Sequence, residues 1–341
     1  MKYAYNGALH IHTTFSDGSS SIENVIKYAK KAGLKWIIIT DHNNLDGLSY
    51  EGWHNGVLVL VGEEISPATE NHYLALDVKE IISPDLPPEA FIQEVKKQGG
   101  IGFVAHPDEK HGRKNSHKPL RWSDWSITGF DGIEIWNYLS DWVDNFDDKK
   151  QIQHYISRND ILKGPSKQTL KWWDELNNNS EAIVPAVGGV DAHALVYKVL
   201  GFDVKVFPYI DTFKTLTNRI YTDEKLSENF EVAKKQVLNA LKSGKNLIFN
   251  RCWDKSNDPI FYLKDKDKKY YAGDTVEYSE NCVIIAKFPY KAQIRLIYDG
   301  QLIWECVREE FIFEHLDRGK YRIEAYLGDK PYVFSNPINI I

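Results

Sequence analysis

The chain has 341 residues, 43% of them hydrophobic and 26% charged, and this length favours two folded domains over one. Its 42 basic and 48 acidic side chains give a formal net charge of −6, which argues against a protein that coats nucleic acid with a basic surface. The three cysteines form no CxxC pair, so neither a disulfide framework nor a cysteine-based zinc site is expected. Because we find neither a membrane-spanning apolar run nor a signal peptide, we expect a cytoplasmic protein that does not bind membranes.

Helical and strand patterns alternate from residue 20 onward. Apolar residues recur at helical spacing over 22–29, and Gly33 ends this pattern. The short apolar runs at 36–39 and 57–61 are typical of strands buried on both faces. The pattern continues with a helix near 88–98 and strands at 101–105, 133–136 and 184–187. Strands that alternate with helices predict a parallel sheet or barrel, here an α/β domain over residues 1–245.

Residues 108–180 interrupt this alternation and contain six of the ten tryptophans. Such a segment is expected either as an insertion or lid over the site or as ordinary core, since tryptophan is often buried for packing alone.

After a helix at 231–241 the pattern changes to short strands only. Residues 294–298 and 302–304 flank Asp299-Gly300, a sequence typical of a hairpin turn. Apolar and polar residues alternate over 321–327, as in a half-buried strand. Residues 246–341 therefore predict a small antiparallel β-domain, similar to a sandwich.

Histidines and acids stand where the predicted strands of the barrel end. They are His10 and His12 with Asp17 beyond them, Asp41-His42, Glu63-Glu64, His106, and Asp191 with His193. In a parallel barrel the carboxyl ends of the strands meet on one face, where active sites lie. Imidazole and carboxylate groups together suit Zn, Mn or Fe, so the pattern predicts a divalent metal centre.

Five motifs in this order resemble the PHP (polymerase and histidinol phosphatase) domain family. They are LHIHTTFSDG (9–18), TDHNN (40–44), GEEIS (62–66), AHP (105–107) and GVDAH (189–193). The β-domain is similar to the carboxyl-terminal module of two-domain PHP hydrolases. The resemblance implies a distorted (β/α)7 barrel that holds two or three divalent ions.

The resemblance also implies a ligand for each ion. One ion would be held by His10, His12, Glu64 and Asp191; a second, bridged by Glu64, by His72 and His106; and a third by Asp17, His42 and His193. Among these, Asp191, His193 and Glu64 would take the catalytic roles. Asp41 is expected to support its neighbours rather than to bind an ion, and Glu64 rather than Glu63 is expected as the bridge.

A basic loop follows His106 and predicts a phosphate-binding role for Lys110, Arg113 and Lys114, with a solvated surface loop as the alternative. We therefore expect a metal-dependent phosphoesterase that uses a metal-activated hydroxide on a small phosphorylated metabolite or nucleotide. The alternatives are hydrolysis of an amide, carbamate or carboxylic ester, 5′–3′ exonuclease activity on short single strands, or a binding module with an inert barrel. Long duplex nucleic acid is not an expected partner, and the oligomeric state is open.

Overall fold

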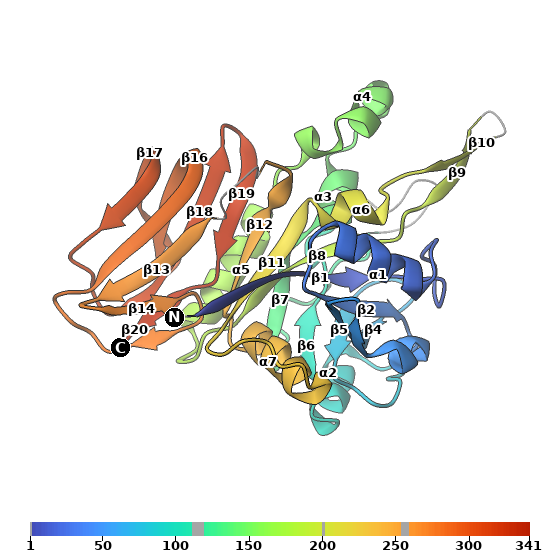
Figure 1. Cartoon of the computed structure of the whole chain (residues 1–341), viewed down its shortest axis with the longest axis horizontal. Coiled ribbons are helices and arrows are strands. Elements are labelled where there is room, and N and C mark those ends of the chain that lie inside the picture. Colours follow the sequence, from blue (N-terminus) through green and yellow to red (C-terminus); the bar gives the residue numbers. More distant parts are fainter. Residues whose placement is uncertain (1, 111–118, 200–201, 254–258) are drawn as a thin grey trace.

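The computed structural model describes residues 2–110, 119–199, 202–253 and 259–341 (Figure 1). Seven strands close a barrel, namely β1 (Tyr3–Ile11), β2 (Trp36–His42), β4 (Val57–Ile65), β5 (Tyr73–Leu76), β6 (Ile101–Val104), β7 (Gly132–Asn137) and β8 (Ala186–Ala192). Neighbouring strands are parallel except that β5 runs antiparallel to β4 and β6. The expected distorted seven-stranded barrel is confirmed, and the reversed β5 is the distortion.

Helices pack on the outside of the barrel through apolar faces. In α1 the buried residues Ile22, Val25, Ile26 and Ala29 recur at helical spacing. The helices are α1 (Ile22–Lys31), α2 (Pro88–Lys97), α3 (Tyr138–Asp144), α4 (Gln151–Ile156), α5 (Lys167–Asn178), α6 (Tyr209–Phe213) and α7 (Phe230–Lys242). A short strand β3 (Gly52–His54) pairs with β4, and β9 (Val196–Val199) pairs with β10 (Phe202–Lys205). No helix in the described ranges is long and apolar enough to cross a membrane.

Residues 108–180 are not an insertion along their whole length, because β7 lies within them and is a barrel strand. Of the six tryptophans in this segment, five are buried and Trp125 packs partly buried against the same core. Core packing, and not a separate lid, thus explains the aromatic composition of the described part of this segment.

The carboxyl-terminal part is a β-sandwich whose strands pair antiparallel, except that its β15 and β20 are parallel. Its strands are β11 (Leu216–Thr222), β12 (Asn246–Asn250), β13 (Ile260–Asp265), β14 (Lys268–Tyr271), β15 (Thr275–Val276), β16 (Val283–Tyr298), β17 (Gln301–Phe313), β18 (Gly319–Leu327), β19 (Lys330–Ser335) and β20 (Ile338–Ile340). The predicted Asp299-Gly300 turn joins β16 to β17, and both turn residues have the positive φ that such a hairpin requires.

The barrel and the sandwich share backbone pairing. β11 lies before residue 245, yet it pairs with β1 of the barrel on one side and with β12 on the other. β12 in turn pairs with β19 of the sandwich. The buried ammonium of Lys320, on β18, donates hydrogen bonds to the carbonyl of Asn177 in the last turn of α5 and to those of Ser180 and Ala182 just beyond it. Backbone ladders and side chains therefore join the two parts.

Candidate metal centre

The carboxyl ends of the barrel strands place the predicted ligands on one face. His10 lies on β1, His42 ends β2, Glu64 lies on β4 and Asp191 lies on β8, while His12, His106 and His193 follow strand ends. His72 precedes β5, and because β5 is antiparallel its amino end lies at the same face of the barrel. The reversed strand thus explains how His72 joins side chains that come from the opposite ends of other strands.

Glu64 is the centre of the group, and its two oxygens face different histidines. Oε1 lies 2.8 Å from His72 Nδ1, 3.2 Å from His106 Nε2 and 3.4 Å from His10 Nε2. Oε2 lies 2.8 Å from His42 Nδ1 and 3.5 Å from His12 Nε2. A carboxylate that presents one oxygen to each of two sets of imidazoles fits a bridge between two ions.

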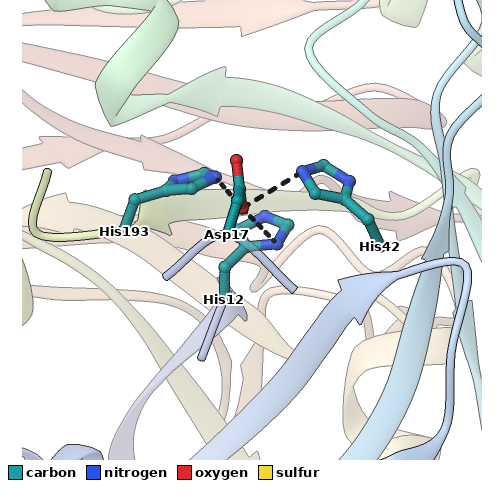
Figure 2. A group of neighbouring side chains, drawn as sticks. All are labelled: His12, Asp17, His42 and His193. Carbon is teal, nitrogen blue, oxygen red and sulfur yellow. Dashed lines mark ion pairs between the residues drawn. The ribbon is translucent and has the colours of Figure 1, made fainter. Parts of the chain in front are cut away.

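A second carboxylate, Asp17, lies among three histidines, His12, His42 and His193 (Figure 2). Its Oδ1 lies 3.0 Å from His193 Nε2, 3.5 Å from His42 Nε2 and 4.0 Å from His12 Nδ1. The loop that carries Asp17 is held by Asp41, which accepts hydrogen bonds from the backbone and hydroxyl of Thr13 at 2.6 and 2.7 Å. Asp41 therefore supports the loop, in the role that the sequence indicated.

Asp191 lies between the histidines around Glu64 and those around Asp17. Its Oδ1 lies 3.3 Å from His12 Nε2, 3.3 Å from His193 Nδ1 and 3.7 Å from His10 Nε2. Four clusters in the described chain bring ligand atoms within 4.8 Å of one another, and together they contain all nine predicted ligands. They are His12, Asp17, His42 and His193; His10, His106 and Asp191; His10, His12 and Glu64; and His42, Glu64 and His72.

The three predicted ligand sets map onto these clusters with two differences. Asp17, His42 and His193 fall together, joined by His12. Asp191 clusters with His10 and His106 rather than with the full first set, and His72 shares a cluster with His42 rather than with His106. The nine predicted ligands therefore lie close together in the structure, and their roles as metal ligands stay a prediction.

Buried histidine nitrogens without hydrogen-bond partners indicate that the site fits a cation. Nε2 of His10 and both ring nitrogens of His12 are buried and find no hydrogen-bond partner among the described residues. A buried polar atom left without a partner costs about 1–3 kcal/mol, so a native site normally satisfies it. Imidazole nitrogens that converge on carboxylates match the donor preference of a divalent transition ion, so these residues fit such a group.

Backbone strain marks three of the predicted ligands. His10, His106 and Asp191 have positive φ angles of 64°, 28° and 47°, which residues with a Cβ rarely adopt. The register of β1 against β8 also shifts between Leu9 and Ile11, so His10 stands at an irregularity that can redirect its side chain. Strain of this kind persists where the surrounding fold enforces it, commonly at functional sites.

The ionisation of the group follows from burial and from neighbouring charge. Burial would raise the pKa of Glu64, but His42, His72 and His10 act in the opposite direction and bring it well below the usual value. Burial lowers the pKa of His12, and the nearby His193 and His42 lower it further. Glu64 is therefore held deprotonated and His12 neutral. Burial acts to lower the pKa values of His10, His42 and His106, but neighbouring carboxylates raise them above the usual value, so a cation would compete with protons at those three rings.

Sequence reasoning missed Glu134, a fully buried carboxylate on β7. Its Oε1 lies 2.8 Å from His10 Nδ1, and its Oε2 accepts hydrogen bonds from His106 N and from Asn137 Nδ2. The available signal was a charged residue inside an apolar strand, because glutamate is rarely buried unless it has partners.

Glu63 points away from the cluster and accepts a hydrogen bond from Ile82 N at 2.9 Å, as the alternation along β4 requires.

A cavity of about 380 Å³ opens onto the centre. Ligand side chains form one part of its wall, and Pro67, Ala68, Leu120, Leu139 and Val143 form another. Lys110 lies instead at a neighbouring cavity of about 520 Å³, with its ammonium 3.6 Å from Asp108 Oδ2. Arg113 and Lys114, the other predicted substrate-binding residues, lie outside the described residues.

Comparisons with known proteins place this geometry in context. The profile of the PHP domain family matches residues 8–324. An uncharacterized protein of Methanocaldococcus jannaschii is 36% identical over 191 residues, covering 49% of this chain and 98% of that protein. A phosphoribosyl 1,2-cyclic phosphate 1,2-diphosphodiesterase of Eggerthella lenta is 35% identical over 80 residues, covering 21% of this chain and 30% of that protein. A solved two-domain Bacteroides vulgatus protein, which contains a predicted PHP-like metal-dependent phosphoesterase, covers 98% of this chain and 95% of its own at a TM-score of 0.44 and 13% identity.

Proposed function

Because the chain belongs to the PHP domain family, we propose that it is a metal-dependent hydrolase whose preferred substrates are small phosphate esters. The observation that carries this proposal is the position of Glu64, which presents its two oxygens to separate sets of histidines within a group of nine potential ligands. When bound, divalent ions supply Lewis acidity that activates water and offsets negative charge on a reacting group.

The residues divide this work by position. Glu64 would bridge two ions, with His72, His106 and His10 on the side of its Oε1 and His12, beside Asp191, on the side of its Oε2. Asp17, His42 and His193 would hold a third ion, and either two or three ions of Zn, Mn or Fe suit this donor set. Asp191 and His193 lie between the ligands around Glu64 and those around Asp17, with Asp191 Oδ1 3.3 Å from His193 Nδ1. This position supports a role for both residues at the reacting bond.

Phosphate esters suit this centre because their charged oxygens can themselves bind the ions. The Eggerthella lenta relative, named for a cyclic phosphate diester, supports phosphoryl chemistry over the 80 residues that it shares with this chain. Lys110, which lies at the neighbouring cavity beside Asp108, and the predicted Arg113 and Lys114 would add positive charge only beside a substrate that extends beyond the 380 Å³ cavity.

One observation favours a second candidate, hydrolysis of an amide, carbamate or carboxylic ester. Among the described residues, the 380 Å³ cavity is lined by no lysine or arginine, and five of its lining residues are apolar. Such a wall suits the uncharged substituent of a carbonyl substrate, which the same ions could polarise.

A substrate screen separates the two candidates. The Mn- and Zn-loaded protein would be assayed with phosphomonoesters, phosphodiesters and carboxylic or carbamate esters. We expect the highest kcat/KM with a phosphate ester, and loss of turnover in both His10→Ala and Asp191→Ala. Turnover that survives both substitutions would overturn the proposed site, and a preference for carbonyl substrates would overturn the proposed bond.

A further inference from the structure

β17 forms a long edge of the sandwich that carries both apolar and charged exposed side chains. Its 13 residues, about 44 Å of extended chain, pair with β16 along one side, with a register shift on each side of Trp304–Arg308, and the described chain places no strand on the other side. Leu302, Trp304 and Val307 are exposed by 53%, 51% and 64%. Natural proteins normally shorten, charge or cover such an edge, because it offers unpaired backbone groups to another strand.

Both faces of this edge carry exposed apolar groups. Trp304 pairs with Leu296 and Cys306 pairs with Ile294, so these residues share the face that Leu296 and Ile294 bury in the core. Trp304 is nevertheless half exposed. Val307, paired with Gln293, is exposed on the opposite face. A partner that covers β17 must therefore extend the sheet itself rather than rest on one face of it.

Charge along β17 selects one register for pairing with a second copy. In a two-fold antiparallel pair the axis must pass through a residue that faces its own copy, since neighbouring residues alternate between the two kinds of ladder position. We compared the five axis positions from Glu305 to Glu309. The regularly paired stretch Trp304–Arg308 is centred on Cys306, and the register against β16 shifts on both sides of it.

Four of these positions oppose like charges. An axis at Glu305, Arg308 or Glu309 sets that charged residue against itself, and an axis at Val307 sets Glu305 against Glu309. Like charges directly opposite each other destabilise a strand pair. The axis at Cys306 opposes no like charges and places Trp304 across from Arg308 twice, where the guanidinium can contact the indole face.

We propose that the chain forms a two-fold symmetric dimer in which β17 of two copies pair antiparallel, with the two Cys306 residues facing each other at the axis. The dimer joins the two sandwiches into one continuous sheet and covers Leu302, Trp304 and Val307. Figure 1 shows β17 at the end of the molecule away from barrel strands β2 and β4, so this pairing leaves the metal centre open. The inference does not depend on the proposed hydrolase activity.

Disulfide trapping tests the register. Paired Cα atoms in an antiparallel ladder lie about 4.5 or 5.5 Å apart, and both spacings are within the range that a disulfide spans. In a Cys252→Ala/Cys282→Ala background, we expect diamide to convert the protein to a covalent dimer through Cys306. Cys306→Ala, which keeps the other two cysteines, should stay monomeric on a non-reducing gel. A Val307→Cys variant without other cysteines that crosslinks faster than Cys306 would overturn the register.

Sedimentation of the full chain tests the dimer itself. We expect the wild type to sediment as a dimer and Trp304→Lys, which opposes Lys to Arg308 twice, to raise the dissociation constant roughly tenfold or more. Adding Arg308→Glu to Trp304→Lys should restore the dimer, a rescue that a misfolded variant would not show. Val232→Lys on α7, an equally exposed apolar position outside β17, is the control and should remain dimeric. A monomeric wild type at every concentration, or a Trp304→Lys variant as dimeric as the wild type, would overturn the proposal.

Discussion

Glu134 orients two predicted metal ligands that stand on different strands of the barrel. Its Oε1 lies 2.8 Å from Nδ1 of His10, and its Oε2 accepts a hydrogen bond of 2.8 Å from the backbone nitrogen of His106. Because Nδ1 of His10 faces Glu134, Nε2 is directed toward Glu64 and Asp191. A carboxylate behind a ligating histidine fixes the orientation of the ring and raises its basicity.

Glu134→Gln keeps the size of the side chain but removes its charge. We expect divalent metal affinity to fall roughly 10–100-fold, the usual effect of losing an outer carboxylate partner. Competition with a chromophoric chelator would measure the affinity. Glu63→Gln is a matched control, because Glu63 is also buried but points away from the cluster. Equal affinities in Glu134→Gln and wild type would contradict this role.

Gly189 lies directly beneath Glu134, so its missing side chain is part of the site. A Cβ at Gly189 would lie 1.5 Å from Oε1 of Glu134, a separation that no packing permits. We expect Gly189→Ala to displace Glu134 and to lower metal affinity roughly tenfold or more, although it removes no ligand. Gly47→Ala is the control, since its Cβ would meet nothing closer than 3.4 Å. Metal content after dialysis would report both, and normal retention in Gly189→Ala would refute the argument.

Arg322 joins the sandwich to the barrel through a buried ion pair. Its guanidinium donates two hydrogen bonds to Asp174 of α5, at 2.8 and 2.7 Å, and one to Glu324 at 2.7 Å. Arg322→Ala leaves the two carboxylates without their partner, so we expect the free energy of unfolding to fall by about 3–5 kcal/mol. Lys287→Ala, which breaks the exposed 2.7 Å pair with Glu310, should cost far less, because water screens an exposed pair. Urea denaturation would measure both, and equal costs would contradict the prediction.

Asp141 gives stability a defined pH dependence. Burial raises the pKa of Asp141 from 3.8 to about 6, although Lys163 N, Gly164 N and Trp136 Nε1 donate hydrogen bonds to it. The folded state therefore binds a proton more tightly than the unfolded state. Stability from this group is fully present below about pH 4 and is lost as the pH rises through about 6, by at most about 3 kcal/mol.

Asp141→Asn has no such titration. We expect the difference in unfolding free energy between wild type and Asp141→Asn to shift in favour of the variant as the pH rises from about 4 to about 7. Urea denaturation at several pH values would measure this difference, and a constant difference across the range would argue against the raised pKa.

The barrel was predictable because its strands are continuous apolar runs, and most of the candidate centre was predictable because its residues follow those runs. The strand β5 was not predicted at all, because four buried residues are too short a pattern to identify a strand, and they carry no signal of its antiparallel direction. Glu134 was missed because its importance lies in a contact with His10, 124 residues away, that no local pattern encodes. The exposed edge of β17 depends on which strands pair beside it, and that also follows only from the assembled sheet.

Anomalous diffraction from crystals of the Zn-loaded protein tests the central claim most directly. We predict at least two anomalous peaks within the group of nine residues, with Glu64 oxygens about 2.0–2.2 Å from the ions that it bridges. Crystals of Zn-loaded His10→Ala protein, grown in the same way, should lose the anomalous peak nearest β1. Zn-loaded crystals with no anomalous peak between Glu64 and the surrounding histidines would contradict the metal centre and the hydrolase proposed from it.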